Sequence, residues 1–193
     1  MSSKVDSERL YFSERQTVKL NRFDCKDWVL DIGGGGEGVI GQLLGEQVIA
    51  IDPLKRELEE APETKSLKIV MDARELKFLD NVFNIATSFF TMMYISSEDK
   101  EKVFQEIYRV LKPGGELYLW DAKIPPCDNT QKDIYIVSLE IQFEQKQIET
   151  GYGTRWTSKG QNMNLYTELG ENTGFHVLEK QEAGETFFIR FIK

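Results

Sequence analysis

The chain has 193 residues, of which 40% are hydrophobic and 29% are charged. These values are typical of a globular protein that buries a sizeable core without disulfide or metal staples. The formal net charge of −8 opposes the phosphate backbones of nucleic acids, so nucleic-acid binding is not expected.

No stretch approaches the ~18 apolar residues of a membrane span, and the first residues lack the apolar core of a signal peptide. We therefore predict a cytoplasmic protein with no membrane partner. The two cysteines, Cys25 and Cys127, show no metal-ligand spacing, and no metal is predicted. Because the chain contains no repeat or linker, residues 1–193 are expected to form a single domain.

Residues 1–27 are polar and mixed in charge, and we predict that they form an N-terminal helical arm. Two interpretations of its aromatic side chains are open. Either they pack on the edge of the sheet, or Tyr11 and Phe12 help to close a pocket.

Residues 28–38, WVLDIGGGGEG, predict a strand, a tight turn and a helix. A compact apolar run precedes the glycines, and apolar residues recur at helical spacing after them. Glycine lacks Cβ, so it permits positive φ angles and lets a ligand approach the bare backbone. Since ligands of parallel α/β sheets bind at the carboxyl ends of the strands, this turn is predicted to face the binding site.

Two further strands are predicted to end in an aspartate, over residues 47–52 and 67–72. A helix is predicted to open at Pro53. A carboxylate at the tip of the second strand can accept hydrogen bonds from both hydroxyls of a ribose, or it can cap the following helix. The side chains that end the first three strands should converge on one edge of the sheet: Asp31, Asp52 and Asp72.

Residues 82–88 predict a fourth strand that runs into FFTMMY, and residues 116–121 predict a fifth strand. Repeated strand-helix units require right-handed crossovers and a parallel sheet. The aromatic residues that follow the fourth strand either face a flat apolar ligand or pack under the next helix.

Alternating apolar residues predict an inserted β-hairpin over residues 133–156. The hairpin is either a lid over the site or an extra pair of strands that extends the sheet or joins two subunits. A helix that includes residues 163–169 is predicted to end near Gly174. Residues 175–180 and 186–192 predict two antiparallel strands.

Together these segments resemble a class I S-adenosylmethionine-dependent methyltransferase over residues 29–121. VLDIGGGG is similar to the glycine motif of that family, VIAID to its acidic motif, IVMDA to its adenine motif, and RVLKPGGELYLWD to the segment through its fifth strand. The resemblance implies an α/β fold with a Rossmann-like, seven-stranded, mostly parallel sheet. It also implies helices on both faces and an antiparallel last strand, and the alternating residues described above add a β-hairpin insertion after the fifth strand.

The resemblance further implies S-adenosylmethionine as cofactor and S-adenosylhomocysteine as product. The residues around the methionine part of the cofactor would be Asp31, Gly33, Gly34 and Gly35. Asp52 would hold the ribose hydroxyls, and Pro53 would pack near the adenosine. Asp72 would bind the adenine amino group beside the backbone of Ala73. Ser88 and Phe89 would line the space between cofactor and substrate.

One position departs from the family pattern. The usual DxGxGxG motif would place its third glycine at position 37, where this chain has Glu37, and Gly38 follows one residue later. The loop is either one residue longer or turns differently at its exit, so Gly36 and Gly38 are left out of the predicted contacts.

The acidic edge suits this cofactor, because its sulfonium and ammonium groups are attracted to carboxylates that would repel a pyrophosphate. Methyl transfer requires a nucleophile held close and aligned with water excluded, so no catalytic residue can be named from the sequence. The predicted function is S-adenosylmethionine-dependent methyl transfer to a small-molecule acceptor. Candidate substrate contacts are Tyr11, Tyr94, Tyr135, Tyr152, Arg155 and Trp156.

Two alternative functions are left open. The first is an NAD(P)-dependent oxidoreductase, because Gly33, Gly35 and Gly38 permit the GxGxxG spacing of dinucleotide-binding loops. The second is a cofactor-binding regulator without transfer activity. The methyl acceptor and the oligomeric state cannot be read from the sequence.

Overall fold

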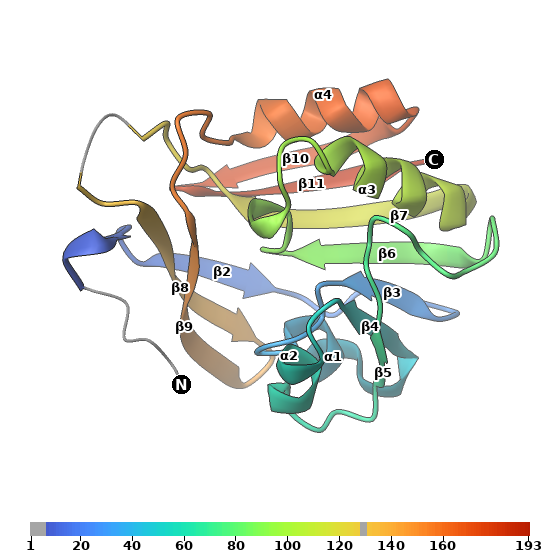
Figure 1. Cartoon of the computed structure of the whole chain (residues 1–193). Helices are drawn as coiled ribbons and strands as arrows, with labels where there is room; N and C mark the ends of the chain where they lie inside the picture. The colour runs from blue at the N-terminus through green and yellow to red at the C-terminus, as the bar shows by residue number, and fades with distance from the viewer. Residues whose placement is uncertain (1–6, 128–130) are drawn as a thin grey trace.

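A computed structural model describes residues 7–127 and 131–193 of the chain and shows two β-sheets (Figure 1). The larger sheet has seven strands in the order β10-β11-β7-β6-β3-β4-β5. Its strands are β3 (Val29–Ile32), β4 (Val48–Asp52), β5 (Leu67–Val70), β6 (Phe83–Phe89), β7 (Leu111–Ala122), β10 (His176–Ala183) and β11 (Thr186–Ile192). The smaller sheet has four strands, β1 (Leu10–Phe12), β2 (Gln16–Leu20), β8 (Ile134–Phe143) and β9 (Lys146–Arg155).

The helices of the described chain are short. They are α1 (Val39–Leu44), α2 (Lys55–Glu60), α3 (Lys100–Val110) and α4 (Met163–Thr173), with 3-10 turns η1 (Ser7–Arg9), η2 (Gly45–Gln47) and η3 (Met92–Tyr94). None of these helices is long and apolar enough to cross a membrane.

The topology of the seven-stranded sheet confirms the predicted fold class. Its five strands β3 to β7 pair in parallel with one another, whereas β11 is antiparallel to both of its neighbours, β7 and β10. Every residue of β3 is buried, as expected for a central strand that is covered on both faces. The carboxyl ends of β3, β4, β5 and β6 therefore meet at one edge of the sheet.

The two faces of this sheet are covered differently. On one face, α3 and α4 pack on the sheet, and the buried side of α3 includes Val103, Phe104 and Ile107. On the other face, α1 shares a core with the four-stranded sheet, in which Val137 and Ile141 of β8 are buried. The four-stranded sheet thus covers part of the face on which the resemblance predicted helices.

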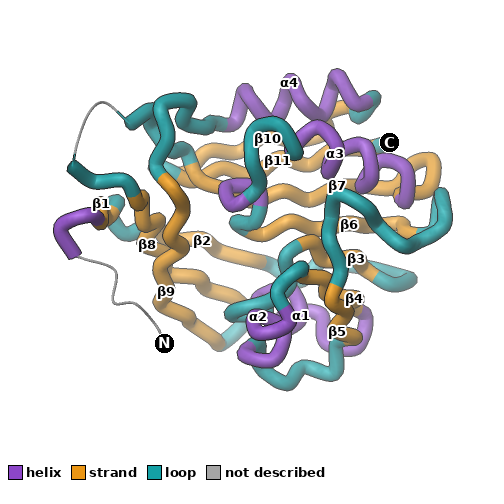
Figure 2. Tube along the Cα trace, in the orientation of Figure 1, coloured by secondary structure: helices purple, strands orange, loops and turns teal. Residues whose placement is uncertain are grey.

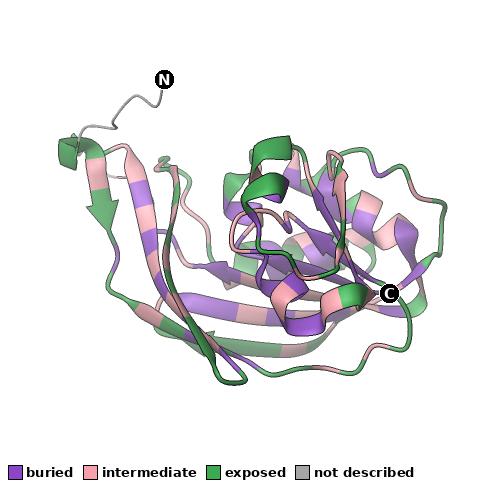
Figure 3. Ribbon diagram, turned by 90° about the horizontal axis from the view of Figure 1, so that it is seen from below, coloured by how far each residue is buried: buried purple, intermediate pink, exposed green. Residues whose placement is uncertain are grey.

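The predicted hairpin over residues 133–156 is present as β8 and β9, which pair antiparallel along their whole length. Buried and half-buried residues alternate along β8, because one of its faces packs on the core (Figure 3).

The predicted N-terminal helical arm is wrong for the residues that the structure describes. Strands β1 and β2 pair in parallel with β8, one after the other along the same edge. In β2, Val18 and Leu20 are buried whereas Lys19 is exposed, which is the alternation of a strand that is covered on one face. The first six residues of the predicted arm lie outside the described chain.

A second correction concerns Pro53, which does not open a helix. Helix α2 begins at Lys55, after an extended Leu54. The Leu54 N–H instead donates to the Asp52 carboxylate at 2.8 Å, so that Asp52 shapes the turn between β4 and α2.

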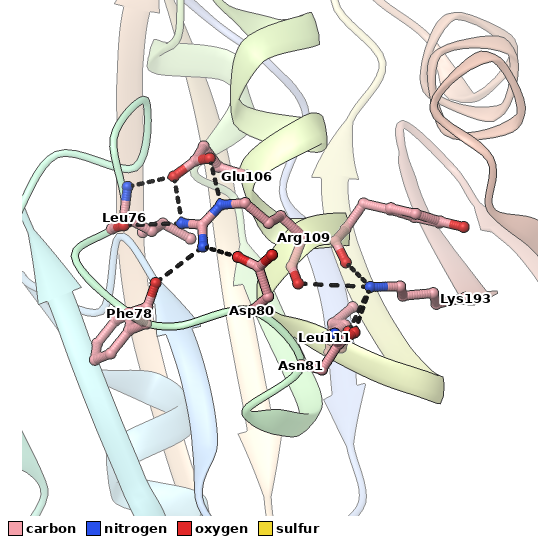
Figure 4. A network of polar contacts seen from close by, with 9 residues as sticks. Leu76, Phe78, Asp80, Asn81, Glu106, Arg109, Leu111 and Lys193 are labelled. Atoms are coloured by element: carbon pink, nitrogen blue, oxygen red, sulfur yellow. Dashed lines mark hydrogen bonds and ion pairs between the residues drawn. The ribbon is translucent and has the colours of Figure 1, made fainter.

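Residues 71–82, between β5 and β6, form turns and loop rather than a helix (Figure 2). Arg109 of α3 holds this stretch by donating to the carbonyls of Leu76 and Phe78, each at 2.9 Å, and to the carboxylate of Asp80 at 2.7 Å (Figure 4). Glu106 neutralises the guanidinium and also accepts from the Leu76 N–H. In the same network, Lys193 donates to the carbonyl of Leu111 and so ties the end of the chain to the start of β7.

Candidate functional site

A cavity of about 980 Å³ opens at the carboxyl ends of β3, β4, β5 and β6. It lies at the upper end of the range for small-molecule sites, roughly 300–1,000 Å³. The strand ends and the loops that follow them form most of its wall, and residues of α1, α2 and α3 and Gly151 and Tyr152 of β9 complete it. This is the edge of the sheet at which the sequence predicted a binding site.

The glycine loop that follows β3 is bound to the adjacent strand β4. The N–H groups of Gly33 and Gly34 both donate to the carbonyl of Ile51, at 2.8 and 3.0 Å. Gly33 has a φ angle of +73°, which other residues rarely adopt. A Cβ atom on Gly34 would lie 2.6 Å from a carboxylate oxygen of Asp31 and 2.7 Å from the Cβ of Ala50. The loop therefore keeps a bare backbone against the cavity.

Asp31 is the most deeply buried carboxylate of the cavity wall, with 2% of its surface exposed. The Thr87 hydroxyl donates to it at 2.7 Å. Burial raises the pKa of Asp31 to about 7; the Thr87 hydrogen bond opposes this shift, and the nearby Asp52 adds to it. A cationic ligand group beside Asp31 would favour its ionised form.

Asp52 ends β4 and lies beside the glycine loop. A Cβ atom on Gly35 would approach the Asp52 carboxylate to 2.9 Å, which shows how closely the two are packed. Burial raises the pKa of Asp52 and is opposed by the N–H of Leu54, while the carboxylate of Glu57 raises it further.

Asp72 follows β5 and differs from the other two aspartates, because it is already paired. Arg74 donates to its carboxylate at 2.6 Å and also to Asp99 at 3.1 Å. The Arg74 hydrogen bond lowers the pKa of Asp72, which stays ionised.

The structure brings the predicted cofactor residues together, with one exception. The residues that line the cavity are Asp31, Gly33, Gly34, Gly35, Asp52, Pro53, Asp72, Ala73 and Phe89. Ser88 does not line it, because its side chain is buried within the sheet, and its hydroxyl has no hydrogen-bond partner in the described chain. Gly36 and Gly38, which were left out of the prediction, line the cavity and have positive φ angles.

The predicted substrate residues divide into two groups. Tyr94 and Tyr152 line the cavity. The other aromatic candidates lie elsewhere: Tyr11 stacks on Tyr135 with ring centroids 5.1 Å apart and contacts Trp156 at 4.9 Å. They form an aromatic cluster that fastens β1 to the hairpin. Arg155 lines a separate, smaller depression beside Arg9 and Asp133.

The segment that carries Tyr94 is held from several sides. The Thr154 hydroxyl of β9 donates to the carbonyl of Met93 at 2.8 Å, and the Lys100 ammonium donates to the carbonyl of Ile95 at 2.6 Å. Tyr94 lines the cavity, and 54% of its surface is exposed. Desolvation of its hydroxyl raises its pKa, and the carboxylate of Glu37 adds to the shift.

Glu37 is the main residue of the cavity wall whose place was not predicted. It stands in the glycine loop, and its carboxylate accepts a hydrogen bond from the Thr150 hydroxyl of β9. The Tyr152 hydroxyl also lies against this carboxylate. Burial raises the pKa of Tyr152, and the Glu37 carboxylate raises it further. In the sequence, Glu37 stood out because it replaces the third glycine of the motif. That departure did not indicate that Glu37 contacts β9.

Comparison with known proteins identifies the same region. Residues 30–119 match the family model described as a methyltransferase domain. The chain is 32% identical over 141 residues to the ubiquinone/menaquinone biosynthesis C-methyltransferase UbiE of Pseudoalteromonas translucida, which covers 65% of this chain and 55% of the relative. It is 35% identical over 101 residues to the phosphoethanolamine N-methyltransferase of Plasmodium falciparum, covering 48% of this chain and 38% of that relative. The chain thus spans about half or less of the length of these relatives.

Among solved structures, the fold is similar to that of a SAM-dependent methyltransferase from Methanosarcina mazei. The TM-score is 0.63 with 19% sequence identity, and the match covers 89% of this chain and 94% of the other. Residues 30–119 thus match a methyltransferase domain in sequence, and the described chain has the fold of an S-adenosylmethionine-dependent methyltransferase.

Proposed function

We propose that this protein transfers a methyl group from S-adenosylmethionine to a small-molecule acceptor. The observation that carries the proposal is the convergence of three strand-end aspartates and a bare glycine loop on one cavity. The names of the relatives, which refer to ubiquinone/menaquinone biosynthesis and to phosphoethanolamine, support an acceptor of small size.

The cavity fits this cofactor in its shape and its charge. The close packing of Gly34 and Gly35 against Asp31, Asp52 and neighbouring residues excludes side chains at these positions, so the loop presents its backbone close to both carboxylates. We assign the cofactor's ammonium to the neighbourhood of Asp31, its ribose hydroxyls to Asp52, and its adenine to the wall formed by Asp72, Ala73 and Met71. Carboxylates stabilise a ligand that carries a sulfonium and an ammonium.

The residues of the cavity wall bind the cofactor and the acceptor, orient them and exclude water from the site. When bound, S-adenosylmethionine supplies an electrophilic methyl group. Phe89 and Phe90 supply apolar rings to the cavity wall, and Tyr94 of η3 and Tyr152 of β9 line it as well. Holding a nucleophile close in a site shielded from water is sufficient to accelerate a displacement of this kind.

Isothermal titration of the full chain with S-adenosylmethionine and with S-adenosylhomocysteine tests the proposal. We expect both ligands to bind at a single site. Absence of heat and of thermal stabilisation with both ligands would overturn it.

The dinucleotide alternative has one observation in its favour, since Gly33, Gly35 and Gly38 all line the cavity. However, Glu37 within this loop and Glu57 beside it would repel a pyrophosphate placed there. Protection from thermal unfolding by NADH, without protection by S-adenosylmethionine, would favour the oxidoreductase over the methyltransferase. A regulator without transfer activity would instead bind the cofactor tightly and release no S-adenosylhomocysteine with a broad panel of acceptors.

A further inference from the structure

The end of the cavity nearest the hairpin combines aromatic rings with one carboxylate. Tyr152 of β9 packs on Phe90 with ring centroids 5.8 Å apart, and Tyr94 of η3 lines the same region. Glu37 faces these tyrosines from the glycine loop, and its charge acts on the hydroxyls of both. In the proposed function, the cofactor lies along the strand ends, so this end is the one left for the acceptor.

The charges of the cavity wall oppose an anionic acceptor. Its acidic residues are Asp31, Glu37, Asp52, Glu57, Glu60, Asp72 and Asp99. Among the lining residues, all of which belong to the described chain, Arg74 is the only basic one. Its guanidinium is already bound to Asp72 through two nitrogens and to Asp99 through the third. A phosphate or carboxylate on the acceptor would therefore meet carboxylates without an available cation.

The same arrangement suits an amine. Aromatic faces attract an organic cation, and a carboxylate beside them forms a charge-assisted hydrogen bond with an ammonium. The Thr150 hydroxyl holds Glu37 in place from β9, so the carboxylate is positioned before any ligand arrives. A carboxylate side chain in a loop otherwise made of glycines is a distinctive feature of this wall.

Building on the proposed function, we propose that the methyl acceptor is a primary or secondary amine without a phosphate or carboxylate group, bound between Glu37 and the rings of Tyr94 and Tyr152. The bound ammonium transfers a proton to the Glu37 carboxylate. The nitrogen lone pair then attacks the methyl carbon, the new N–C bond forms, and the electron pair of the broken S–C bond stays on sulfur. The products are the methylated ammonium and the neutral thioether.

The test uses the full chain saturated with S-adenosylhomocysteine and three probes that share one ring. Benzylamine, benzyl alcohol and benzyl phosphate carry a cationic, a neutral and an anionic group. Titration calorimetry should show that benzylamine binds at least about tenfold more tightly than benzyl alcohol, the size of one charge-assisted hydrogen bond. Benzyl phosphate should show no binding.

Matched variants assign the effect to one side chain. Glu37→Gln keeps an acceptor for the Thr150 hydroxyl and should weaken benzylamine binding about tenfold while leaving benzyl alcohol unchanged. Glu46→Gln removes an exposed carboxylate that does not line the cavity, and it should change neither affinity.

Equal binding of the amine and the alcohol, or binding of the phosphate, would overturn the amine assignment while leaving the proposed function intact. Failure of S-adenosylhomocysteine itself to bind would instead overturn the proposed function, and the amine assignment with it.

Discussion

The seven-stranded sheet and the four-stranded sheet contribute to one cavity in different ways. The larger sheet presents the ends of four parallel strands, which carry the three aspartates and the glycine loop. The smaller sheet contributes only the part of β9 that includes Gly151 and Tyr152. In the proposed function, the parallel topology brings together a cofactor wall, and the inserted sheet adds Tyr152 to the acceptor end of the cavity, beside Glu37 and Tyr94. Under the proposed function, substitutions in the two sheets should therefore have different effects.

The largest effect is expected at Asp31, in the cofactor wall. Its folded-state pKa, about 7, lies above its ordinary value of 3.8, so ionisation is unfavourable in the folded state. Stability associated with this group is present at low pH and is lost as pH rises toward 7. Asp31→Asn should therefore be more stable than the wild type at pH 8 by up to about 4 kcal/mol, and the difference should shrink toward pH 4.

Urea unfolding at pH 4 and pH 8 measures this difference. The same variant should bind S-adenosylmethionine less tightly, because the asparagine offers no charge to an ammonium. If the variant were more stable at pH 8 and bound the cofactor as tightly as the wild type, Asp31 would not bind the cofactor's ammonium.

Arg109 is expected to give the next largest effect, although it does not touch the cavity. Arg109→Ala removes the donors that hold residues 71–82 and leaves Glu106 without its partner (Figure 4). We expect a loss of about 2–3 kcal/mol in the free energy of unfolding. Arg15→Ala is the control, since this arginine forms an exposed ion pair with Glu149 in the smaller sheet and should contribute below about 1 kcal/mol. Equal losses in the two variants would contradict the assigned role of Arg109.

Asp52→Ala should weaken S-adenosylhomocysteine binding by about 1–3 kcal/mol, the value of a hydrogen bond to a charged group. Asp27→Ala is the matched control, because Asp27 precedes β3 at the opposite end of the strand, where it pairs with Lys112. Titration calorimetry of both variants measures the difference. An unchanged dissociation constant in Asp52→Ala would exclude Asp52 from the ribose site.

The smallest effect is expected in the four-stranded sheet. Tyr11→Ala removes one ring of the aromatic cluster with Tyr135 and Trp156 and should lower the free energy of unfolding by about 1–2 kcal/mol. Because Tyr11 does not line the cavity, the affinity for S-adenosylhomocysteine should not change. A loss of affinity as large as that of Asp52→Ala would show that the two sheets do not act separately.

The larger sheet could be predicted from the sequence because its signals are local. Each strand is an apolar run that ends in a turn or an acidic residue, and parallel pairing then brings Asp31, Asp52 and Asp72 to one edge. Ser88 was misplaced within this sheet. Its side chain is fully buried inside the protein, whereas Phe89, the last residue of the strand, lines the cavity.

The smaller sheet could be predicted only in part. The hairpin over residues 133–156 has long alternating strands, whereas β1 has only three residues, and β2 has five, of which three are polar. Their strand character depends on pairing with β8, which begins at Ile134, and no local pattern indicates such a distant partner. The contact between Glu37 and Thr150 escaped prediction for the same reason, since it joins the two sheets.

The parallel pairing of β1 and β2 with β8 has a consequence for how the chain folds. Leu10 pairs with Ile134 and Gln16 pairs with Leu139, so these contacts close very long loops. Contacts of this kind form slowly, because the entropy of loop closure opposes them. During synthesis, β1 and β2 leave the ribosome well before the strand that completes them. Until β8 arrives, their unpaired backbone groups are open to pairing with other chains. Strands β1 and β2 are thus made before their partner but are among the last to reach their final structure, and misassembly of this protein is expected in that interval.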